Sequence, residues 1–355
     1  MKNADGQLVP ESPYRGNPRR TYWKTGMRTS SVLSIPDLYT KRFEIKQDDR
    51  IATAGSCFAQ HIARHMRKNG YRVIDAEPAP PNLTASGAAE YGYSIYSARY
   101  GNIYYTRQLM QLVREAIGER TPQERVWERD GRYFDALRPT IFPGGHETPE
   151  LVLKHREPHL RAIVSMLKQA NIFVFTMGLT EAWVSKADGT VYPVAPGTVA
   201  GSYDEEKYEF YNFTYTDVVR DFLEFRILAR RINPRIKFVL TVSPVPLAAT
   251  ATTSHVLTAT TYSKAVLRAA AGEIIRRCAD VDYFPSYEII SQSYLEHSPF
   301  DETGRNVRPE AVDIVMRYFF DEHKPIALGL SPGHDVKSSG EQVFCDDALL
   351  EIFAE

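Results

Sequence analysis

The stretch RIATAGSCFAQHIARHMRKNGYRVIDAE, residues 50–77, decides the fold because it contains every part of a βαβ unit. A short apolar run at 51–54 reads as a strand that ends at Gly55. Residues 71–77 read as a second strand after a glycine stop at Gly70. Strand, tight turn, helix and strand in this order predict a parallel sheet. The helix between the strands is marked by apolar residues at helical spacing: Phe58, Ile62 and Met66.

The same alternation continues to the end of the chain. We expect further strands at 171–178, 236–246 and 281–290. Helices are expected from about Thr106, at 149–169, at 217–234, at 261–280 and at 309–323. Two glycine turns, at Asp130-Gly131 and Asp188-Gly189, predict small β-hairpin insertions. The pattern indicates an α/β fold: a three-layer α/β/α sandwich with a parallel sheet of about five strands.

Domain limits follow from the same pattern. Residues 1–45 are rich in Pro, Arg and Tyr without a sustained period, which is typical of an arm that wraps a domain. The main domain is predicted at 46–325, with insertions near 78–150 and 183–215. Residues 326–355 are interpreted as a C-terminal tail with one short amphipathic helix, which docks on its own domain or on a partner.

Composition excludes several classes of function. The 43 basic residues against 44 acidic ones leave a net charge of −1, which favours neither nucleic acid nor an anionic membrane as partner. The sequence contains no uninterrupted run of about 18 apolar residues, so it predicts no membrane span. The three cysteines form no C-x-x-C pair and predict no zinc site or disulfide framework, so we expect a cytoplasmic protein without metal or cofactor.

Ligands of parallel sheets gather at the carboxyl ends of the strands, where four loops with small or hydroxyl residues are expected to meet. Ser56 follows the first strand, and we expect its hydroxyl in a shallow open pocket. Its backbone N–H and that of Cys57 begin a helix, where they would stabilise an oxyanion. Cys57 is the rival nucleophile because a helix N-terminus lowers a thiol pKa. A simple helix cap is the structural alternative for Ser56.

Six ordered motifs then carry a family resemblance. The motifs in order are AGSCFAQHIARHMRKNGY, SARYGNIY, FVFTMGLTEAW, LTVSPVP, TYSKAVLRAAA and DYFPSYEII. With these motifs the chain resembles the GSCFA domain family from about residue 12 to residue 320, and that family looks like a branch of the SGNH, or GDSL-like, hydrolase superfamily.

The superfamily resemblance implies an acyl-enzyme mechanism with roles for particular positions. Ser56 would be the nucleophile, although a strict overlay of the first block places Cys57 there. The second block implies Gly101 as an oxyanion donor, with the Asn102 amide beside it. The third block, Gly-x-Asn-Asp in the superfamily, reads Gly178, Leu179, Thr180, Glu181 in this chain, so a hydroxyl replaces the amide donor.

The last superfamily block, Asp-x-x-His, is absent, since the corresponding segment reads FDETGRNVRPEAV. A serine nucleophile still needs a proton acceptor. His255, in the loop expected after the strand at 236–246, is our first candidate for the general base. His297 and His61 remain alternatives, and Arg99 is a candidate contact for a substrate anion.

The sequence therefore predicts a serine esterase or O-acyltransferase that acts on an acylated glycan or small molecule, without a nucleic acid partner. Hydrolysis and transfer share the acyl-enzyme step and are not distinguished by residue type. The alternative is a catalytically impaired glycan-binding or scaffold protein on a hydrolase fold. The sequence makes no prediction of the oligomeric state.

Overall fold

The computed structural model describes residues 12–27, 35–291, 298–323 and 346–353. At its centre lies a five-stranded parallel sheet with the strand order β10-β9-β5-β1-β2. Since β2 and β5 lie on opposite sides of β1, the chain order reverses beside β1, which is the switch point of a doubly wound sheet. The strands are β1 (Arg50–Gly55), β2 (Arg72–Val73), β5 (Ile172–Met177), β9 (Lys237–Val242) and β10 (Val281–Tyr283).

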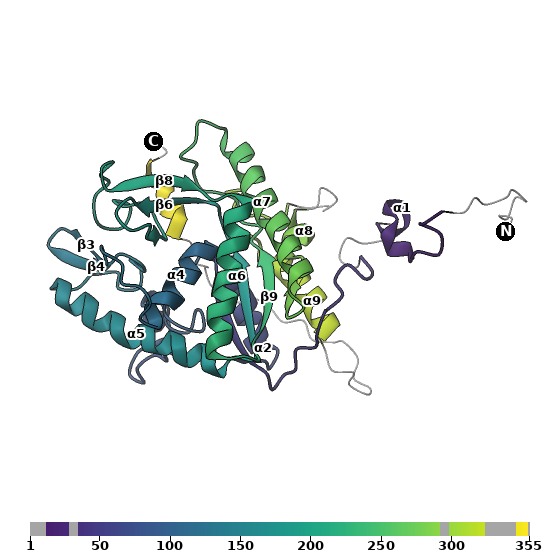
Figure 1. Cartoon of the computed structure of the whole chain (residues 1–355), viewed down its shortest axis with the longest axis horizontal. Coiled ribbons are helices and arrows are strands. Elements are labelled where there is room, and N and C mark those ends of the chain that lie inside the picture. Colours follow the sequence, from purple (N-terminus) through teal and green to yellow (C-terminus); the bar gives the residue numbers. More distant parts are fainter. Residues whose placement is uncertain (1–11, 28–34, 292–297, 324–345, 354–355) are drawn as a thin grey trace, which may run out of the picture.

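Helices cover both faces of the sheet (Figure 1), so the predicted three-layer fold is confirmed. On one face lie α4 (Thr106–Ala116), α5 (Pro149–Gln169), α6 (Tyr215–Ile232) and α7 (Val256–Arg277). On the other lie α2 (Phe58–Lys68), α8 (Ser286–Ile290) and α9 (Pro309–His323).

The central strands separate two hydrophobic cores. Alternate residues of a strand point to opposite faces, so Phe173 and Phe175 of β5 pack with the first group of helices, whereas Ile172 and Val174 pack with the second. All of these side chains are buried. Burial on both faces explains why β5 reads as a continuous apolar run rather than an alternating one.

Two antiparallel insertions lie beside the sandwich, as predicted from the glycine turns. The first is a hairpin of β3 (Val126–Arg129) and β4 (Arg132–Asp135). The second is a three-stranded sheet in the order β7-β6-β8. Its strands are β6 (Glu181–Ser185), β7 (Val191–Tyr192) and β8 (Tyr208–Asn212). The connection between β2 and α4 adds the short helix α3 (Ala85–Glu90).

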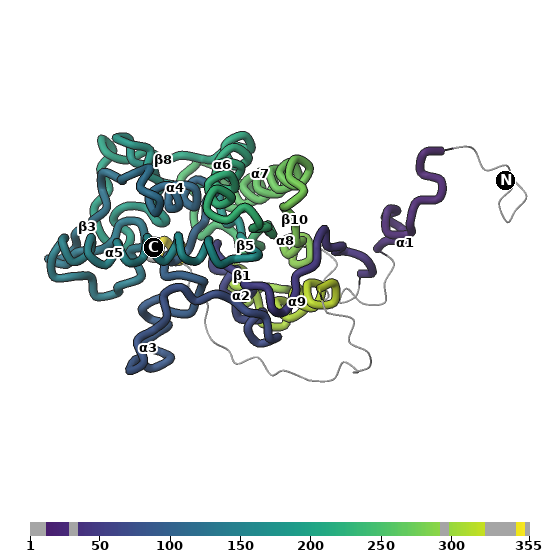
Figure 2. The backbone as a smooth tube through the Cα atoms, turned by 60° about the horizontal axis from the view of Figure 1, so that its bottom comes forward, coloured from purple at the N-terminus to yellow at the C-terminus, as the bar shows by residue number. Residues whose placement is uncertain are grey.

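The terminal segments differ in how they relate to this body. The 3-10 helix η1 (Arg19–Thr21) and α1 (Trp23–Gly26) project away from the sandwich (Figure 1). The C-terminal 3-10 helix η3 (Asp346–Phe353) instead lies against the domain (Figure 2). In this structure the C-terminal helix therefore docks on its own domain, which is one of the two alternatives that we expected for it.

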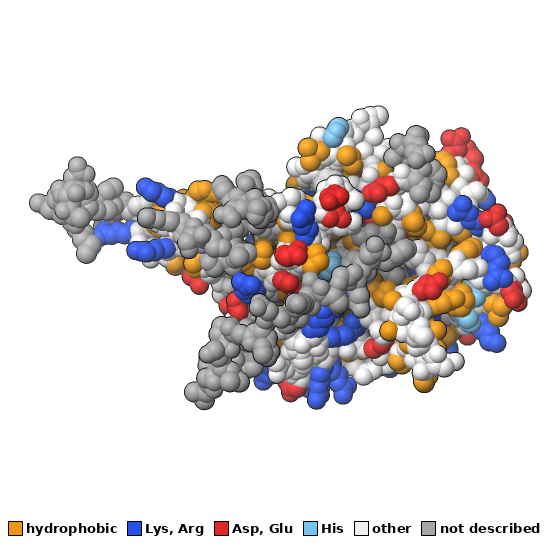
Figure 3. All heavy atoms as spheres, turned by 180° about the vertical axis from the view of Figure 1, so that it is seen from behind, with side chains coloured by type: hydrophobic (Ala, Val, Ile, Leu, Met, Phe, Trp, Pro, Cys, Tyr) orange, Lys and Arg blue, Asp and Glu red, His pale blue; other side chains and the backbone are white. Residues whose placement is uncertain are grey.

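Three predicted elements have different limits. The strand expected at 71–77 pairs over two residues only, and the one at 281–290 is split into β10 and α8. Helix α7 begins at Val256, five residues before the expected Thr261, because His255 caps it. Among the described residues, no helix has the length and apolarity to cross a bilayer. Acidic and basic side chains are interspersed on the face shown in Figure 3.

Candidate functional site

The switch point brings the end of β1 next to the end of β5. Gly55 has a φ of +143°, and a Cβ at this position would lie 2.5 Å from the carbonyl oxygen of Thr176. A Cβ at Gly178 would lie 3.1 Å from the Cβ of Ser56 and 2.8 Å from the ring of Tyr104. Both positions therefore need glycine, and the absence of side chains lets the two strand ends approach closely.

Ser56 lies at this point, but not in the open pocket that we expected. Its side chain is buried, with the residue only 2% exposed. Its backbone N–H donates to the carbonyl of Thr176 at 3.1 Å, which extends the β1–β5 ladder by one residue. That N–H is consequently not available to an oxyanion in this conformation. The Ser56 hydroxyl has no hydrogen-bond partner within the described part of the chain.

Cys57, and not Ser56, is the N-cap residue of α2. The structural alternative for Ser56, a helix cap, is thus not realised. Cys57 is buried and disulfide-bonded, so it offers no free thiol as a rival nucleophile in this structure. Cys278 is free and buried, and Cys345 lies outside the described residues. A disulfide at Cys57 departs from our expectation of reduced cysteines.

Asn102 is the polar centre of the loop that precedes α4. Its side-chain oxygen accepts hydrogen bonds from the Tyr96 hydroxyl and, at 3.4 Å, from the Gln60 amide. Its side-chain nitrogen donates to a carboxylate oxygen of Asp346 at 2.8 Å. The Asn102 amide thus donates to a carboxyl group of the same chain in this structure, and its oxyanion role stays a prediction. Gly101, in the left-handed region at φ +68°, lies beside it.

In the third block, residues 178–181, some polar groups form hydrogen bonds that hold the backbone in place, and one buried hydroxyl has no partner among the described residues. The Gly178 N–H donates to the Tyr104 carbonyl at 3.0 Å. The Thr180 N–H donates to the Ser263 hydroxyl at 3.1 Å, whereas the Thr180 hydroxyl is buried without a partner in the described ranges. Glu181 accepts hydrogen bonds from Thr250 and from the Ala251 N–H at 3.1 Å, so it anchors the loop after β9.

No histidine of the described ranges is hydrogen-bonded to Ser56. His255 is exposed, and its Nδ1 accepts a hydrogen bond from the Leu257 N–H at 3.1 Å as the cap of α7. The ring of His61 packs on Phe58, and burial, with the charges of Arg64 and His65 nearby, lowers its pKa to about 3. His297 lies outside the described residues. The general base therefore stays a prediction.

Four charged residues that the sequence analysis assigned no role complete the site: Lys264, Arg305, Asp346 and Asp347. The Lys264 ammonium donates to the Gly178 carbonyl at 2.8 Å. Arg305 forms an ion pair with Asp347, whose other carboxylate oxygen accepts a hydrogen bond from the Tyr104 hydroxyl at 3.4 Å. The sequence signals were a lysine beside small residues and an acidic pair before an apolar run, and both are equally typical of a solvated surface.

Two cavities flank this cluster. One of about 510 Å³ is lined by Gly101, Asn102 and Asp346, among others. The other, of about 180 Å³, is lined by aromatic side chains of the β6–β8 insertion, Trp183 and Phe210, together with Glu181, Asp347 and Leu350. Among the described residues, no group of three His, Cys, Asp or Glu side chains is arranged to hold a metal ion.

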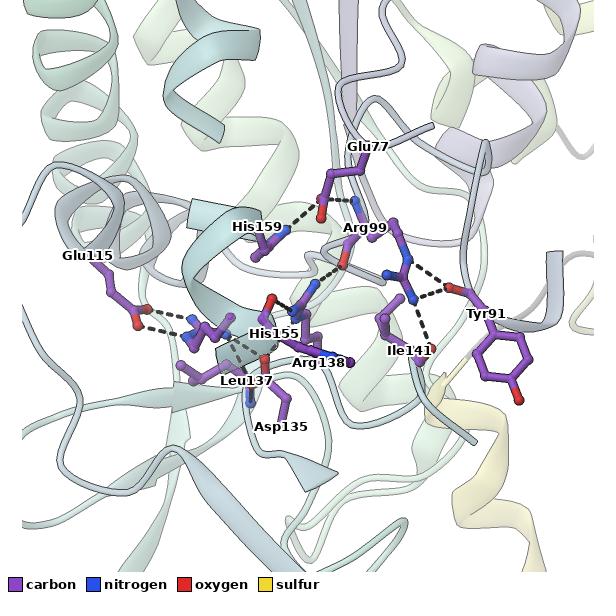
Figure 4. A network of polar contacts seen from close by, with 11 residues as sticks. Glu77, Tyr91, Arg99, Glu115, Asp135, Leu137, Arg138, Ile141, His155 and His159 are labelled. Atoms are coloured by element: carbon purple, nitrogen blue, oxygen red, sulfur yellow. Dashed lines mark hydrogen bonds and ion pairs between the residues drawn. The ribbon is translucent and has the colours of Figure 1, made fainter. Parts of the chain in front are cut away.

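A buried ion network connects the first insertion to the sandwich (Figure 4). Arg156 of α5 bridges Glu115 of α4, at 2.7 Å, and Asp135 of β4, at 2.9 Å. Arg99, the candidate anion contact, donates to the carbonyl of Tyr91 at 2.8 Å. Arg99 therefore holds a loop in place in this structure.

Comparison with known families assigns the chain on most of its length. The GSCFA family matches residues 50–319. The chain belongs to the GSCFA family. The match begins at β1 and ends in α9, so it includes all five strands of the central sheet and the switch point. Searches of curated proteins and of solved structures gave no match.

Proposed function

We propose that this GSCFA protein is an SGNH-like serine esterase or O-acyltransferase that acts on an acylated glycan or small molecule. The observation that carries the proposal is the position of Ser56. Its unpartnered hydroxyl lies at the switch point of a doubly wound sheet, where such folds bind their ligands. An unsatisfied buried hydroxyl is unfavourable for folding, and function is one reason for a protein to keep it.

The step that we propose is nucleophilic acyl transfer. The Ser56 hydroxyl oxygen bonds to the ester carbonyl carbon while its proton passes to a general base, and the carbon–oxygen bond to the leaving alcohol then breaks as that proton is returned to it. The Asn102 amide, which binds the Asp346 carboxylate here, would stabilise the oxyanion. Water or an acceptor hydroxyl then releases the acyl group.

Two side chains are candidates for the base. His255 would have to give up its capping bond to Leu257 and move toward Ser56. Lys264 already lies next to Gly178, and burial lowers its pKa to about 7, so much of it is neutral near neutral pH. A buried neutral lysine accepts the serine proton in known Ser–Lys variants of the catalytic triad. The single substitutions His255→Ala and Lys264→Met distinguish the two candidates, because only loss of the general base should abolish ester hydrolysis.

The test uses a fluorophosphonate probe and p-nitrophenyl acetate on the full chain. Labelling and hydrolysis in the wild type that are both lost in Ser56→Ala support the proposal. Thr53→Val, which removes another buried unpartnered hydroxyl on β1, is the matched control for a mere packing change. Labelling that persists in Ser56→Ala would exclude Ser56 as the nucleophile. In protein kept reduced, labelling that is lost only in Cys57→Ala would instead assign the nucleophile to Cys57.

A second candidate function is glycan binding without catalysis. The burial of Ser56 and the aromatic wall of Trp183 and Phe210 favour it. Aromatic faces are suited to stacking on sugar rings. Calorimetric titration of neutral and acidic oligosaccharides into the Ser56→Ala variant would show binding that does not need the nucleophile.

A cytoplasmic location is part of the esterase proposal and rests on the sequence alone. The disulfide at Cys57 argues for a less reducing environment, since stable disulfides are rare in the cytosol. Quantification of free thiols in protein purified without reductant shows whether Cys57 is disulfide-bonded or reduced.

A further inference from the structure

The C-terminal segment, residues 346–351, contacts the site through its two acidic side chains. Asp346 accepts the 2.8 Å hydrogen bond from the Asn102 amide. Asp347 forms its ion pair with Arg305 and contacts the hydroxyl of Tyr104. Both aspartates are buried. Adjacent residues of one short segment therefore place two carboxylates in a site built by residues far away in the sequence.

The cations in this site are buried and depend on that segment. Arg305 is 6% exposed, and both carboxylates within 4 Å of it in the described structure, Asp347 and Glu351, belong to the segment. The Arg305 Nε is buried and has no hydrogen-bond partner in the described ranges. Lys264 is 1% exposed, and the acidic charge that acts on it is that of Asp347. Without the segment, the buried Arg305 guanidinium would have no carboxylate within 4 Å in the described structure, and Lys264 would lose the acidic charge that acts on it.

The segment also lies between the two cavities. Asp346 lines the cavity of about 510 Å³, whereas Asp347 and Leu350 line the one of about 180 Å³. Its displacement would join them into one cleft that passes Asn102, Tyr104 and Arg305. That cleft has a donor for a carbonyl oxygen at one end and a cation for an anionic group beside it.

We propose that the C-terminal segment is a pseudosubstrate, and that the cleft binds an acyl ester whose carboxylate or phosphate takes the place of Asp347 on Arg305. The ester part of this statement rests on the proposed function; the anion site does not. Because the segment is tethered, its effective concentration is high and a free ligand must displace it. A bidentate guanidinium fits either anion.

The first experiment measures displacement and needs no catalysis. Hydrogen exchange of the amides of residues 347–351 is followed with increasing succinate or inorganic phosphate. We expect protection in the free protein and its loss, by about tenfold or more, at saturating anion. A response to one anion alone identifies the headgroup. Protection that neither anion changes, or that is absent from the start, would overturn the proposal.

Variants of the segment sharpen the same measurement. Asp347→Asn removes the charge on Arg305 and should lower protection without any ligand, by roughly tenfold. Glu351→Gln is the matched control, because Glu351 lies in the same segment, is exposed and approaches Arg305 only to 3.6 Å. We expect it to behave as the wild type. Equal effects of the two substitutions would show that the site does not select Asp347.

The second experiment tests the link with catalysis. Mono-4-nitrophenyl glutarate, which carries a carboxylate, is compared with the neutral 4-nitrophenyl valerate. We expect a KM about tenfold lower for the anionic ester, loss of that preference in Arg305→Met, and its partial recovery in Arg305→Lys. Displacement by succinate without hydrolysis of either ester would reject the proposed function and keep the anion site. Hydrolysis with equal KM values would reject the anion site alone.

Discussion

At the scale of single residues, Gly55 sets the direction in which the chain leaves β1. The residue has a positive φ, and its hydrogen side faces the backbone of Thr176. These are two separate reasons for glycine, since a side chain would be strained and would also collide. The position of Ser56 next to β5 depends on both.

Gly55→Ala is expected to lower the free energy of unfolding by about 2–4 kcal/mol, because strain and steric collision add. Urea denaturation measures this. Gly118 has a φ of +77° with no atom within 4 Å of an added Cβ, so Gly118→Ala isolates the strain, and we expect about 1 kcal/mol or less. Equal losses in the two variants would show that the contact with Thr176 is relieved by relaxation.

Lys264 gives stability a pH dependence whose sign follows from its burial. Burial lowers the pKa from 10.5 to about 7, against the opposing charge of Asp347. Between these values the unfolded chain binds more protons, so stability rises with pH, by at most about 1.4 kcal/mol per unit. Below pH 7 the full penalty of the buried charge is present. Unfolding followed between pH 7 and 9 should show a shallower rise in Lys264→Met, whereas exposed Lys186→Met keeps the wild-type slope.

Only part of the site could be predicted from single residues. The strand–glycine–helix pattern placed Ser56 at the end of β1, because local spacing determines that position. Its burial and the hydrogen bond of its N–H to Thr176 depend on contacts with a strand more than a hundred residues away. Arg305 lies in the segment FDETGRNVRPEAV, which the sequence analysis read only for its missing histidine. Nothing local distinguishes a buried arginine from a solvated one.

At the scale of elements, α5 connects the first insertion to the sandwich through Arg156. Its guanidinium bonds to Glu115 on α4 and to Asp135 on β4, and all three side chains are buried. Burial raises the pKa of the Asp135 carboxyl, but Arg156 and Arg138 outweigh this and hold that pKa at about 2. Asp135 is therefore ionised throughout the physiological range.

Arg156→Met is expected to destabilise the protein by about 3–5 kcal/mol, because the buried Glu115 loses the cation that pairs with it and Asp135 keeps only Arg138. Thermal or urea unfolding measures the loss. Arg276, exposed and paired with Glu273 within one helix, is the control, and Arg276→Met should leave the unfolding midpoint unchanged. A loss below about 1 kcal/mol in Arg156→Met would mean that water or a shift of β4 compensates.

The limits of α7 show why some elements were misjudged. The segment before Thr261 is rich in threonine and small residues and was interpreted as loop. In the structure the helix extends back to Val256, where the His255 ring accepts the Leu257 N–H in place of a usual Ser, Thr, Asp or Asn cap. The histidine that we predicted as a base thus has a structural role in the described conformation.

At the scale of the whole molecule, the topology followed from the order of apolar runs. All five parallel strands were expected, because buried strands and amphipathic helices alternate along the chain. The docking of η3 could not be predicted in its detail, since it depends on cations from α7 and from the segment before α9. Long-range charge pairing leaves no periodic signal in a single sequence.

The docked C-terminal segment should respond to pH through Asp346. Burial, with the charge of Asp347, raises the pKa of this carboxyl to about 6, against the hydrogen bonds from Asn102 and Thr140. The docked form binds more protons than the released form between the ordinary value of 3.8 and about 6, so docking weakens as pH rises through this window. Protection factors of residues 347–351 at pH 5 should exceed those at pH 7.5.

Asp346→Asn removes the titrating group and should abolish this difference, whereas Glu351→Gln should keep it. Protection factors are corrected for the intrinsic pH dependence of exchange. The same protection at both pH values in the wild type would contradict the assignment to Asp346.

The ion network around Arg156 has a consequence for how a ligand enters. Buried ion pairs of Arg156 connect α4, α5 and the β3–β4 hairpin. We therefore expect no hinge motion of the hairpin relative to these helices. The opposite wall of the cleft is a short peptide held through two aspartates. We therefore expect ligand access to Ser56 to depend on movement of residues 346–351, while the β3–β4 hairpin stays in place.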